Sequence, residues 1–564
     1  MLLILVFAFQ LRVVDPVGLW GSAERVLGPD LRGPMTVRRD SRTWIATIGN
    51  ASASFSSGDS MVFKFGPTRG TYRFHVSTDG RELRGFWIQP PLHDGPQPFS
   101  TPVTLRRIAA NRWVGQVVPL DDAVSLYLDI RRQRDRSLFA RLRNPDGSVG
   151  DRAYRVTQIG TSLRLIDASD TAQKTTAYLD ARASAMTLNF PGLGSWTLTR
   201  RDRDHAIGFY ARTPATPYIY RPPERLPDGW TTGSLRGAEL DAPRIDSLVQ
   251  RIIDVDAGLA GQPLVHSVLI ARHGKLVLEE YFYGFTRDMP HDLRSASKTF
   301  ASILVNLAAR RGAAIDPAAR VYTLFPDYRP FANDDARKSR ISLAHLMTMT
   351  SGLACDENDD SSPGNEGTMQ SQTSQPDWYK FTLDLPMAHA PGDTAVYCSA
   401  TVNLIGGVIR NASHIWLPQL FDERLGQPLG FGRYHFDLMP TGEGYLGGGV
   451  RMRPRDLLKI GQLYLDHGTW GGRQLIDSDW VAESVRPHTE ISPSNTDGYD
   501  WHTDTIRLGD RRLAEYYAAG NGGQLLIIVP ELDLVVAFTA GNYNSYGVWR
   551  AYREEWLVRY IVPR

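Results

Sequence analysis

Residues 294 to 300 place a serine and a lysine at a spacing that suits a nucleophile and its base. The segment reads Arg-Ser-Ala-Ser-Lys-Thr-Phe, so Ser295 and Lys298 are three residues apart. Side chains at this spacing lie on one face of a helix, where the hydroxyl and the amine can meet. The apolar residues 300 to 309 predict that this helix is buried, and a helix N-terminus stabilises developing negative charge. The alternative is a capping serine followed by a surface lysine.

Two further polar motifs lie far downstream. Tyr397-Cys-Ser399 precedes the apolar residues 402 to 409, and Gly520-Asn-Gly-Gly-Gln524 runs directly into an apolar strand. Each motif has an ordinary explanation by itself. A tyrosine beside an apolar segment is commonly half-buried in a core. The glycines could simply form a turn before the strand. The order of the three motifs is more specific than any one of them.

This order resembles that of penicillin-binding proteins and class C β-lactamases, the serine β-lactamase-related hydrolase family. The resemblance extends from about residue 241 to the C-terminus and includes two connecting segments, at 341–353 and 447–456. It implies an α+β domain of the β-lactamase/transpeptidase type, with an antiparallel sheet flanked by helices. It also implies a serine hydrolase that forms an acyl-enzyme on a small ester or amide and requires neither a cofactor nor a metal ion.

The resemblance assigns catalytic roles to the first two motifs. Ser295 would be the nucleophile, which needs a base to remove its proton. Lys298 would be that base, provided that burial or a neighbouring cation lowers its pKa toward neutrality. Tyr397 would share the proton with Lys298 and pass it to the leaving group. Ser399 would support the site through hydrogen bonds.

The third motif would bind substrate. By resemblance, the backbone N–H groups of Ser295 and Gln524 would stabilise the oxyanion, and losing one such donor typically costs about 3–4 kcal/mol. Gly522 and Gly523 would let substrate approach the strand backbone closely. Asn521 stands where β-lactamases and transpeptidases usually have a lysine, and a neutral amide binds a carboxylate less strongly than an ammonium does.

Asn521 in place of the family's lysine favours an esterase or amidase over efficient β-lactam hydrolysis. Ser399 in place of the family's asparagine points the same way. A penicillin-binding or sensor-like protein that becomes acylated without turnover is the main alternative. A cysteine hydrolase using Cys398 is another, although its partner histidine is not evident. An α/β-hydrolase is disfavoured because the chain contains no G-x-S-x-G elbow.

Composition narrows the class of protein and its partners. The chain has 564 residues, of which 42% are hydrophobic and 22% charged, as in globular proteins with ample core. The net charge of +2 gives no reason to expect nucleic acid or acidic membranes as partners, and the oligomeric state stays open. Cys355 and Cys398 would form a disulfide in an exported protein and stay as thiols in a reducing cytosol.

The chain divides into four segments. Residues 1–14 begin with nine apolar residues, which form either a truncated signal peptide, implying export to the periplasm or outside, or a buried first strand of a cytoplasmic protein. Residues 15–220 alternate in short runs with turns at 78–81 and 145–148, which predicts an all-β accessory domain, a barrel or a sandwich. Residues 221–240 form a proline-rich linker, and 241–564 form the hydrolase domain.

Within the hydrolase domain, the patterns predict helices at 240–256 and 549–561 and strands at 265–272, 275–283, 524–529 and 534–540. The acidic loop from Cys355 to Glu366 resembles an EF-hand only in part, because Ser361 replaces the required glycine and Gly367 occupies the last ligand position. We interpret this segment as a solvated loop in preference to a calcium site.

Overall fold

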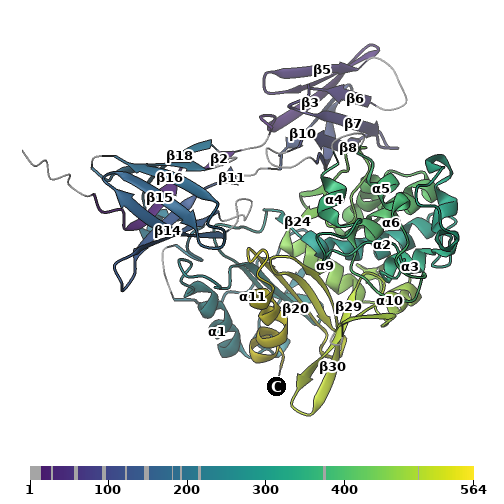
Figure 1. Ribbon diagram of the computed structural model, residues 1–564. Coiled ribbons are helices and arrows are strands. Elements are labelled where there is room, and N and C mark those ends of the chain that lie inside the picture. The colour runs from purple at the N-terminus through teal and green to yellow at the C-terminus, as the bar shows by residue number, and fades with distance from the viewer. Residues whose placement is uncertain are drawn as a thin grey trace, which may run out of the picture.

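The computed structural model describes residues 14–26, 29–55, 61–91, 97–120, 123–144, 151–180, 182–190, 194–213, 217–372, 376–492 and 495–563. The apolar residues 1–9 and the turn expected at 145–148 lie outside the described residues, so those two expectations stay untested. Three parts are visible in the ribbon: a barrel, a smaller β unit and a mixed C-terminal unit (Figure 1).

Eight antiparallel strands close into a barrel because the first strand pairs with both β12 and β18. Alternate side chains point inward, so Leu163 and Leu165 are fully buried while Arg164 between them is exposed. Trp20 and Trp196 also fill the interior. The barrel strands are β1 (Gly18–Ser22), β12 (Tyr127–Arg132), β13 (Leu138–Arg143), β14 (Asp151–Ile159), β15 (Ser162–Asp167), β16 (Lys174–Leu179), β17 (Ala185–Phe190) and β18 (Gly194–Arg200). The all-β fold predicted here, a barrel or a sandwich, is confirmed and is a barrel.

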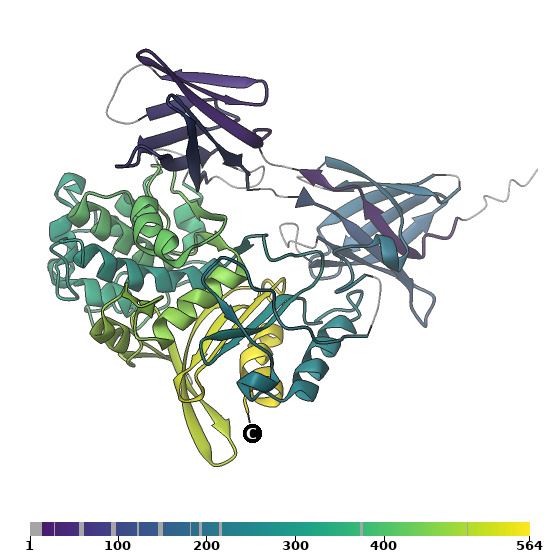
Figure 2. The same ribbon diagram turned by 180° about the vertical axis from the view of Figure 1, so that it is seen from behind.

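A second β unit lies between β1 and β12 in the chain, so residues 15–220 form a barrel and a separate sheet. Its strands are β3 (Gly33–Asp40), β4 (Thr43–Ile48), β5 (Ala51–Phe55), β6 (Met61–Lys64), β7 (Thr71–Val76), β8 (Glu82–Gln89), β9 (Phe99–Ala109) and β10 (Arg112–Val117). This sheet stands above the helices of the C-terminal unit, as the reverse view also shows (Figure 2).

The smaller sheet is joined to the C-terminal unit by strand pairing. β9 pairs with β23 (Tyr434–Asp437), which continues through β24 (Val450–Met452) to β22 (His291–Asp292). Thr101 Oγ1 lies 2.7 Å from His435 Nδ1, and the rings of Phe86 and Trp416 meet edge-on with centroids 5.1 Å apart. The strand β22 ends just before the Ser295 motif, so this sheet reaches the candidate site.

The C-terminal unit is built on a nine-stranded sheet that is antiparallel except for its first pair. In spatial order its strands are β19 (Thr231–Thr232), β21 (Lys275–Tyr281), β20 (Val265–Arg272), β32 (Leu534–Ala540), β31 (Gln524–Val529), β30 (Arg511–Gly520), β29 (His502–Leu508), β28 (Asn495–Asp497) and β27 (Thr489–Ser492). Every residue of β20, β31 and β32 is buried, as expected for strands with both faces covered.

Helices cover both faces of this sheet. α9 (Pro454–Leu465) packs with Leu526 and Ile528 on one face, whereas α1 (Ala242–Ile253) and the π-helix η9 (Tyr552–Ile561) pack with Leu525 and Ile527 on the other. The remaining α-helices are α2 (Thr299–Ala309), α3 (Leu343–Met347), α4 (Glu366–Gln370), α5 (Trp378–Asp384), α6 (Ser399–Ser413), α7 (Leu417–Phe421), α8 (Gln427–Leu429), α10 (Ser478–Ser484) and α11 (Tyr546–Ala551). The predicted α+β architecture is confirmed.

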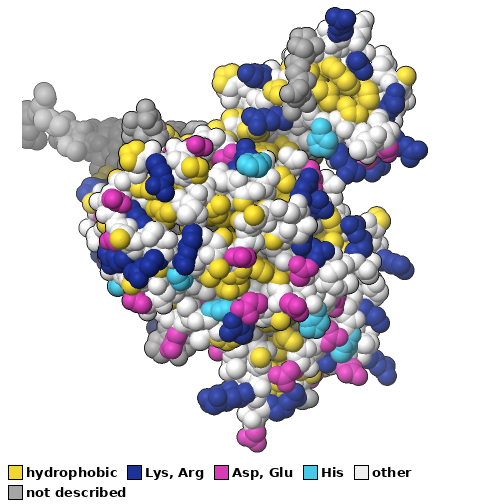
Figure 3. Space-filling view, turned by 90° about the vertical axis from the view of Figure 1, so that its right-hand side faces the viewer, with side chains coloured by type: hydrophobic (Ala, Val, Ile, Leu, Met, Phe, Trp, Pro, Cys, Tyr) yellow, Lys and Arg dark blue, Asp and Glu magenta, His cyan; other side chains and the backbone are white. Residues whose placement is uncertain are grey.

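Most local expectations for this unit hold. The strands predicted at 265–272, 524–529 and 534–540 have those bounds, whereas the strand predicted at 275–283 ends at Tyr281. The helix predicted at 240–256 is the shorter α1, which is capped by Asp241. The helix predicted at 549–561 is instead the end of α11 followed by η9. No helix in the described part of the chain is long and apolar enough to cross a membrane. Lys, Arg, Asp and Glu side chains are interspersed on the face shown in Figure 3.

Candidate active site

The structure brings Ser295 and Lys298 into direct contact. The Lys298 Nζ atom donates a hydrogen bond to Ser295 Oγ at 3.0 Å, and the same amine also donates to the Gly447 carbonyl oxygen. The two residues lie in a 3₁₀ turn, η3 (Arg294–Lys298), that precedes α2, rather than in the α-helix that we predicted. Side chains at i and i+3 eclipse in a 3₁₀ turn, which explains the close contact.

Tyr397 completes the cluster from the loop before α6. The Lys298 Nζ atom lies 4.9 Å from the centroid of the Tyr397 ring, and Tyr397 is half-buried against the main core. The structure therefore groups Ser295, Lys298 and Tyr397, although 99 residues separate the lysine from the tyrosine in the sequence.

The electrostatic surroundings of Lys298 differ from those that a neutral base requires. Lys298 is only 3% exposed, and burial alone would lower its pKa. Tyr397 and the carboxylates of Glu366 and Glu357 favour the ammonium form more strongly, so the pKa of Lys298 is raised above its usual value. The role of base requires a lowered pKa, and the structure instead gives a raised one because of these neighbours.

The strand β30 approaches the nucleophile through Gly520. A Cβ atom at this position would meet the backbone of the turn that carries Ser295, so only glycine allows the present contact. The sequence analysis used Gly520 only as the first residue of a motif and missed this role. Glycine in a strand is a signal for a close backbone approach, but it does not identify the partner.

The residues of the third motif are divided between the site and the core. The Asn521 side chain donates to Asn544 Oδ1 at 2.8 Å and accepts from the Asn544 N–H at 2.7 Å, and both residues line the cavity that contains Ser295. The Gln524 side chain is fully buried and donates to the Ala540 carbonyl at 2.7 Å, away from the cavity lining.

Gly522 and Gly523 admit neighbouring side chains of the protein. Both have a φ of +98°, and a Cβ atom at Gly522 would lie 2.7 Å from the ring of Tyr543. At Gly523 it would lie 2.9 Å from the Trp549 side chain. These glycines let Tyr543 and α11 pack against the turn, whereas we expected them to leave space for substrate.

A cavity of about 880 Å³ opens at Ser295 and extends along β29 and β30 toward the C-terminal helix. Its polar and aromatic lining includes Ser295, Glu357, Tyr397, His502, Asp504, Glu515, Tyr517, Asn521, Trp549 and Arg553. A volume of this size suits a small organic substrate, because ligand pockets typically measure about 300–1,000 Å³.

Glu357 is a site residue that the sequence analysis missed. Its Oε1 atom accepts the N–H of Ser399 at 2.8 Å, so the Ser399 backbone is bound to this carboxylate. Burial raises the pKa of Glu357. The acidic loop that we interpreted as solvated is thus exposed at residues 358–361 but enters the cavity at Glu357.

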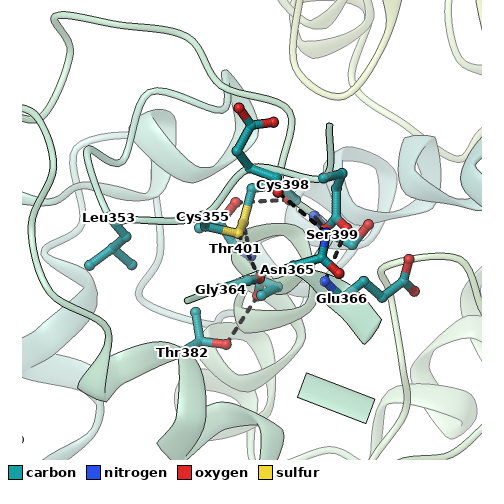
Figure 4. The surroundings of a disulfide bond; sticks show 12 residues. Leu353, Cys355, Gly364, Asn365, Glu366, Thr382, Cys398, Ser399 and Thr401 are labelled. Atoms are coloured by element: carbon teal, nitrogen blue, oxygen red, sulfur yellow. Dashed lines mark hydrogen bonds between the residues drawn. A yellow bond between two sulfur atoms is a disulfide. The ribbon is translucent and has the colours of Figure 1, made fainter. Parts of the chain in front are cut away.

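A disulfide joins Cys355 to Cys398, near Gly364 and Ser399 (Figure 4). Among the described residues, one group has metal-ligating atoms close together: Cys355, Glu357 and Cys398. Both sulfur atoms are committed to the disulfide, so this group offers a metal ion no thiolate. In the acidic loop, the Asp356 and Asp359 carboxylates accept N–H groups of Asn358 and Ser361.

The C-terminal unit contains the residues that match a known family. The model of the Beta-lactamase family matches residues 255–551. The 6-aminohexanoate-dimer hydrolase of Paenarthrobacter ureafaciens is 26% identical over 253 residues, which cover 43% of this chain and 62% of that protein. The chain therefore spans less than two thirds of this relative's length.

Two solved structures are also similar. EstCE1, a hydrolase with promiscuous acyltransferase activity, aligns at 16% identity with a TM-score of 0.44, covering 55% of this chain and 97% of its own. Simvastatin synthase from Aspergillus terreus aligns at 19% identity with a TM-score of 0.42, covering 53% and 93%. The match to the family model covers more than half of the chain, and this protein therefore belongs to the β-lactamase family of hydrolases.

Proposed function

We propose that the protein is a serine hydrolase that forms an acyl-enzyme on Ser295 and cleaves a small ester or amide. The observation that carries this proposal is the hydrogen bond of 3.0 Å between the buried Lys298 amine and the Ser295 hydroxyl, at the mouth of a substrate-sized cavity. A nucleophile within hydrogen-bond distance of a base is the arrangement that covalent catalysis requires.

In the proposed reaction, Ser295 Oγ attacks the substrate carbonyl carbon while its proton passes to the Lys298–Tyr397 pair. The tetrahedral intermediate collapses, the bond to the leaving group breaks, and the leaving group takes that proton. Water then attacks the acyl-enzyme in the same way and releases the acid and free Ser295. The backbone N–H groups of Ser295 and Gln524 would stabilise the oxyanion.

The substrate class follows from the third motif. The Asn521 amide is neutral and is bound to Asn544, so it offers little to an anionic β-lactam carboxylate. This supports an esterase or amidase activity, as does the similarity to a 6-aminohexanoate-dimer hydrolase. The site residues proposed are Ser295, Lys298 and Tyr397 for catalysis, with Asn521 at the substrate.

We further propose that residues 241–564 are the catalytic unit and that residues 15–220 are accessory to it. The disulfide between Cys355 and Cys398 supports an exported protein, because such bonds persist in oxidising compartments. The pairing of β9 with β23 couples the accessory sheet to the catalytic unit.

A panel of chromogenic esters, D-amino-acid amides and nitrocefin tests the proposal, with the S295A variant as the control. We expect turnover of at least one ester or amide, no turnover by S295A, and covalent labelling of the wild type by a fluorophosphonate at Ser295. Labelling without turnover of any substrate would favour a sensor-like protein. Wild-type activity in a folded S295A variant would assign the nucleophile elsewhere.

A further inference from the structure

Glu357 is bound to the backbone that directly follows the Tyr397 side chain, on both sides of Cys398. Its N–H donates to the Tyr397 carbonyl oxygen at 3.1 Å, and its Oε1 atom accepts the Ser399 N–H at 2.8 Å. We infer that Glu357 is a positioning residue that holds Tyr397 against the Lys298 amine, an inference that rests on the catalytic role proposed for Tyr397.

The second carboxylate oxygen of Glu357 binds the start of α4. Glu357 Oε2 accepts the Glu366 N–H at 3.0 Å, at the first residue of α4, while Ser399 is the first residue of α6. A carboxylate can accept at both oxygens, whereas a glutamine has only one acceptor oxygen and would turn an N–H₂ group toward one of these donors. The site therefore requires a carboxylate and not merely a side chain of this size.

The disulfide also joins the segment that contains Glu357 to the segment that contains Tyr397 and Ser399. Cys355 lies two residues before Glu357, and Cys398 directly follows Tyr397, so the S–S bond and the carboxylate act on one short stretch of chain. The exposed part of the loop makes a different set of contacts. The Asp359 carboxylate accepts from the neighbouring Ser361, through its N–H at 2.9 Å and its hydroxyl at 2.6 Å.

Glu357 is also close enough to act on the charge of the catalytic cluster. Its carboxylate is one of the groups that raise the pKa of Lys298, together with Tyr397 and Glu366, and the buried Asp500 carboxylate also interacts with this amine. Removal of the negative charge at Glu357 should therefore affect proton transfer as well as geometry. A residue with a purely structural role would affect neither the pH profile nor kcat in the folded protein.

The test compares E357A, E357Q and the matched control D359N with the wild type on the best substrate of the panel. We expect E357A to lower kcat by about 10- to 100-fold with KM within about twofold, because a small displacement of a catalytic group can cost about 100-fold in rate. E357Q should lose less, and its rise of kcat/KM with pH should shift to lower pH. D359N should match the wild type, and circular dichroism and thermal unfolding should show all variants folded.

Wild-type kcat in E357A, or an increase in KM alone, would overturn the inference. If E357A does not fold, E357Q decides: an unchanged kcat together with an unchanged pH profile would overturn it equally. Activity in S295A would instead contradict the proposed function, so the two failures are distinguishable.

Discussion

Gly520 of β30 lies against the backbone of Leu293, two residues before the candidate nucleophile. The contact is so close that only a residue without a side chain fits at position 520. A Cβ atom at Gly520 would lie 2.2 Å from the Leu293 carbonyl oxygen and 3.0 Å from the Ala296 backbone nitrogen. Both atoms belong to the backbone, so a side chain could be accommodated only if the strand or the nucleophile turn moved. The position of β30 relative to Ser295 thus depends on the absence of a side chain.

The G520A variant should lose about 100-fold in kcat/KM, because separation of the strand from the turn misplaces groups around the reacting carbonyl. Activity on the best ester and thermal unfolding would be measured together. The matched control is G547A, where a new Cβ atom meets nothing within 4 Å. Unchanged activity in G520A would show that the site tolerates this displacement.

Replacement of Lys298 by alanine should lower kcat/KM by several orders of magnitude, since members of a catalytic unit contribute together. The exposed Lys380, which pairs with Asp384 on α5, provides the control K380A. A loss of less than about tenfold in K298A, equal to about 1.4 kcal/mol, would exclude Lys298 as the base.

The raised pKa of Lys298 predicts a definite pH dependence. If the neutral amine is the base, only a small fraction is active at pH 7, and kcat/KM should increase by up to about tenfold per pH unit as the pH rises toward the raised pKa. Initial rates between pH 6 and pH 9.5 measure this slope. A plateau of kcat/KM that begins below pH 7 would indicate a base other than Lys298.

The disulfide should contribute to stability because it closes a loop with a sequence separation of 43 residues. The chain-entropy model gives about 4 kcal/mol for a loop of this length. The double variant C355S/C398S should therefore unfold at lower urea concentration than the wild type, and a reducing agent should destabilise the wild type but not the variant. Equal stability of the two proteins under oxidising conditions would contradict this expectation.

Glu515 should make stability depend on pH. Burial, which outweighs the favourable charge of Arg553, raises the pKa of Glu515 from 4.5 to about 7. Because the folded state binds this proton more tightly, the contribution to stability is full below pH 4.5 and is lost as the pH rises through 7. Relative to E515Q, the wild type should lose about 2–3 kcal/mol of unfolding free energy between pH 5 and pH 8, measured by urea unfolding.

If the wild type instead gained unfolding free energy relative to E515Q between pH 5 and pH 8, or showed no change, the assigned direction would be contradicted. E555Q provides the control, since Glu555 is half exposed on η9 and pairs with Arg559.

Much of the hydrolase unit was predictable from local sequence. The buried strands β20, β31 and β32 appear as apolar runs between turns, and Asp241 with the periodic residues after it defines α1. The contact of Ser295 with Lys298 was also predictable, because it depends only on the conformation of four consecutive residues. The order of three distant motifs indicated the family, which the family model confirmed.

Local patterns thus predicted several strands and helices of the hydrolase unit, the serine–lysine contact and the family. Four features depend instead on packing between distant segments: Glu357 enters the cavity, the Gln524 side chain lies in the core, Gly520 contacts the nucleophile turn, and the pKa of Lys298 is raised. These features could not be predicted because periodicity and turn geometry depend only on a few neighbouring residues of one segment. Close backbone approach, burial and charge depend on which distant segments pack together, and no local pattern encodes those partners.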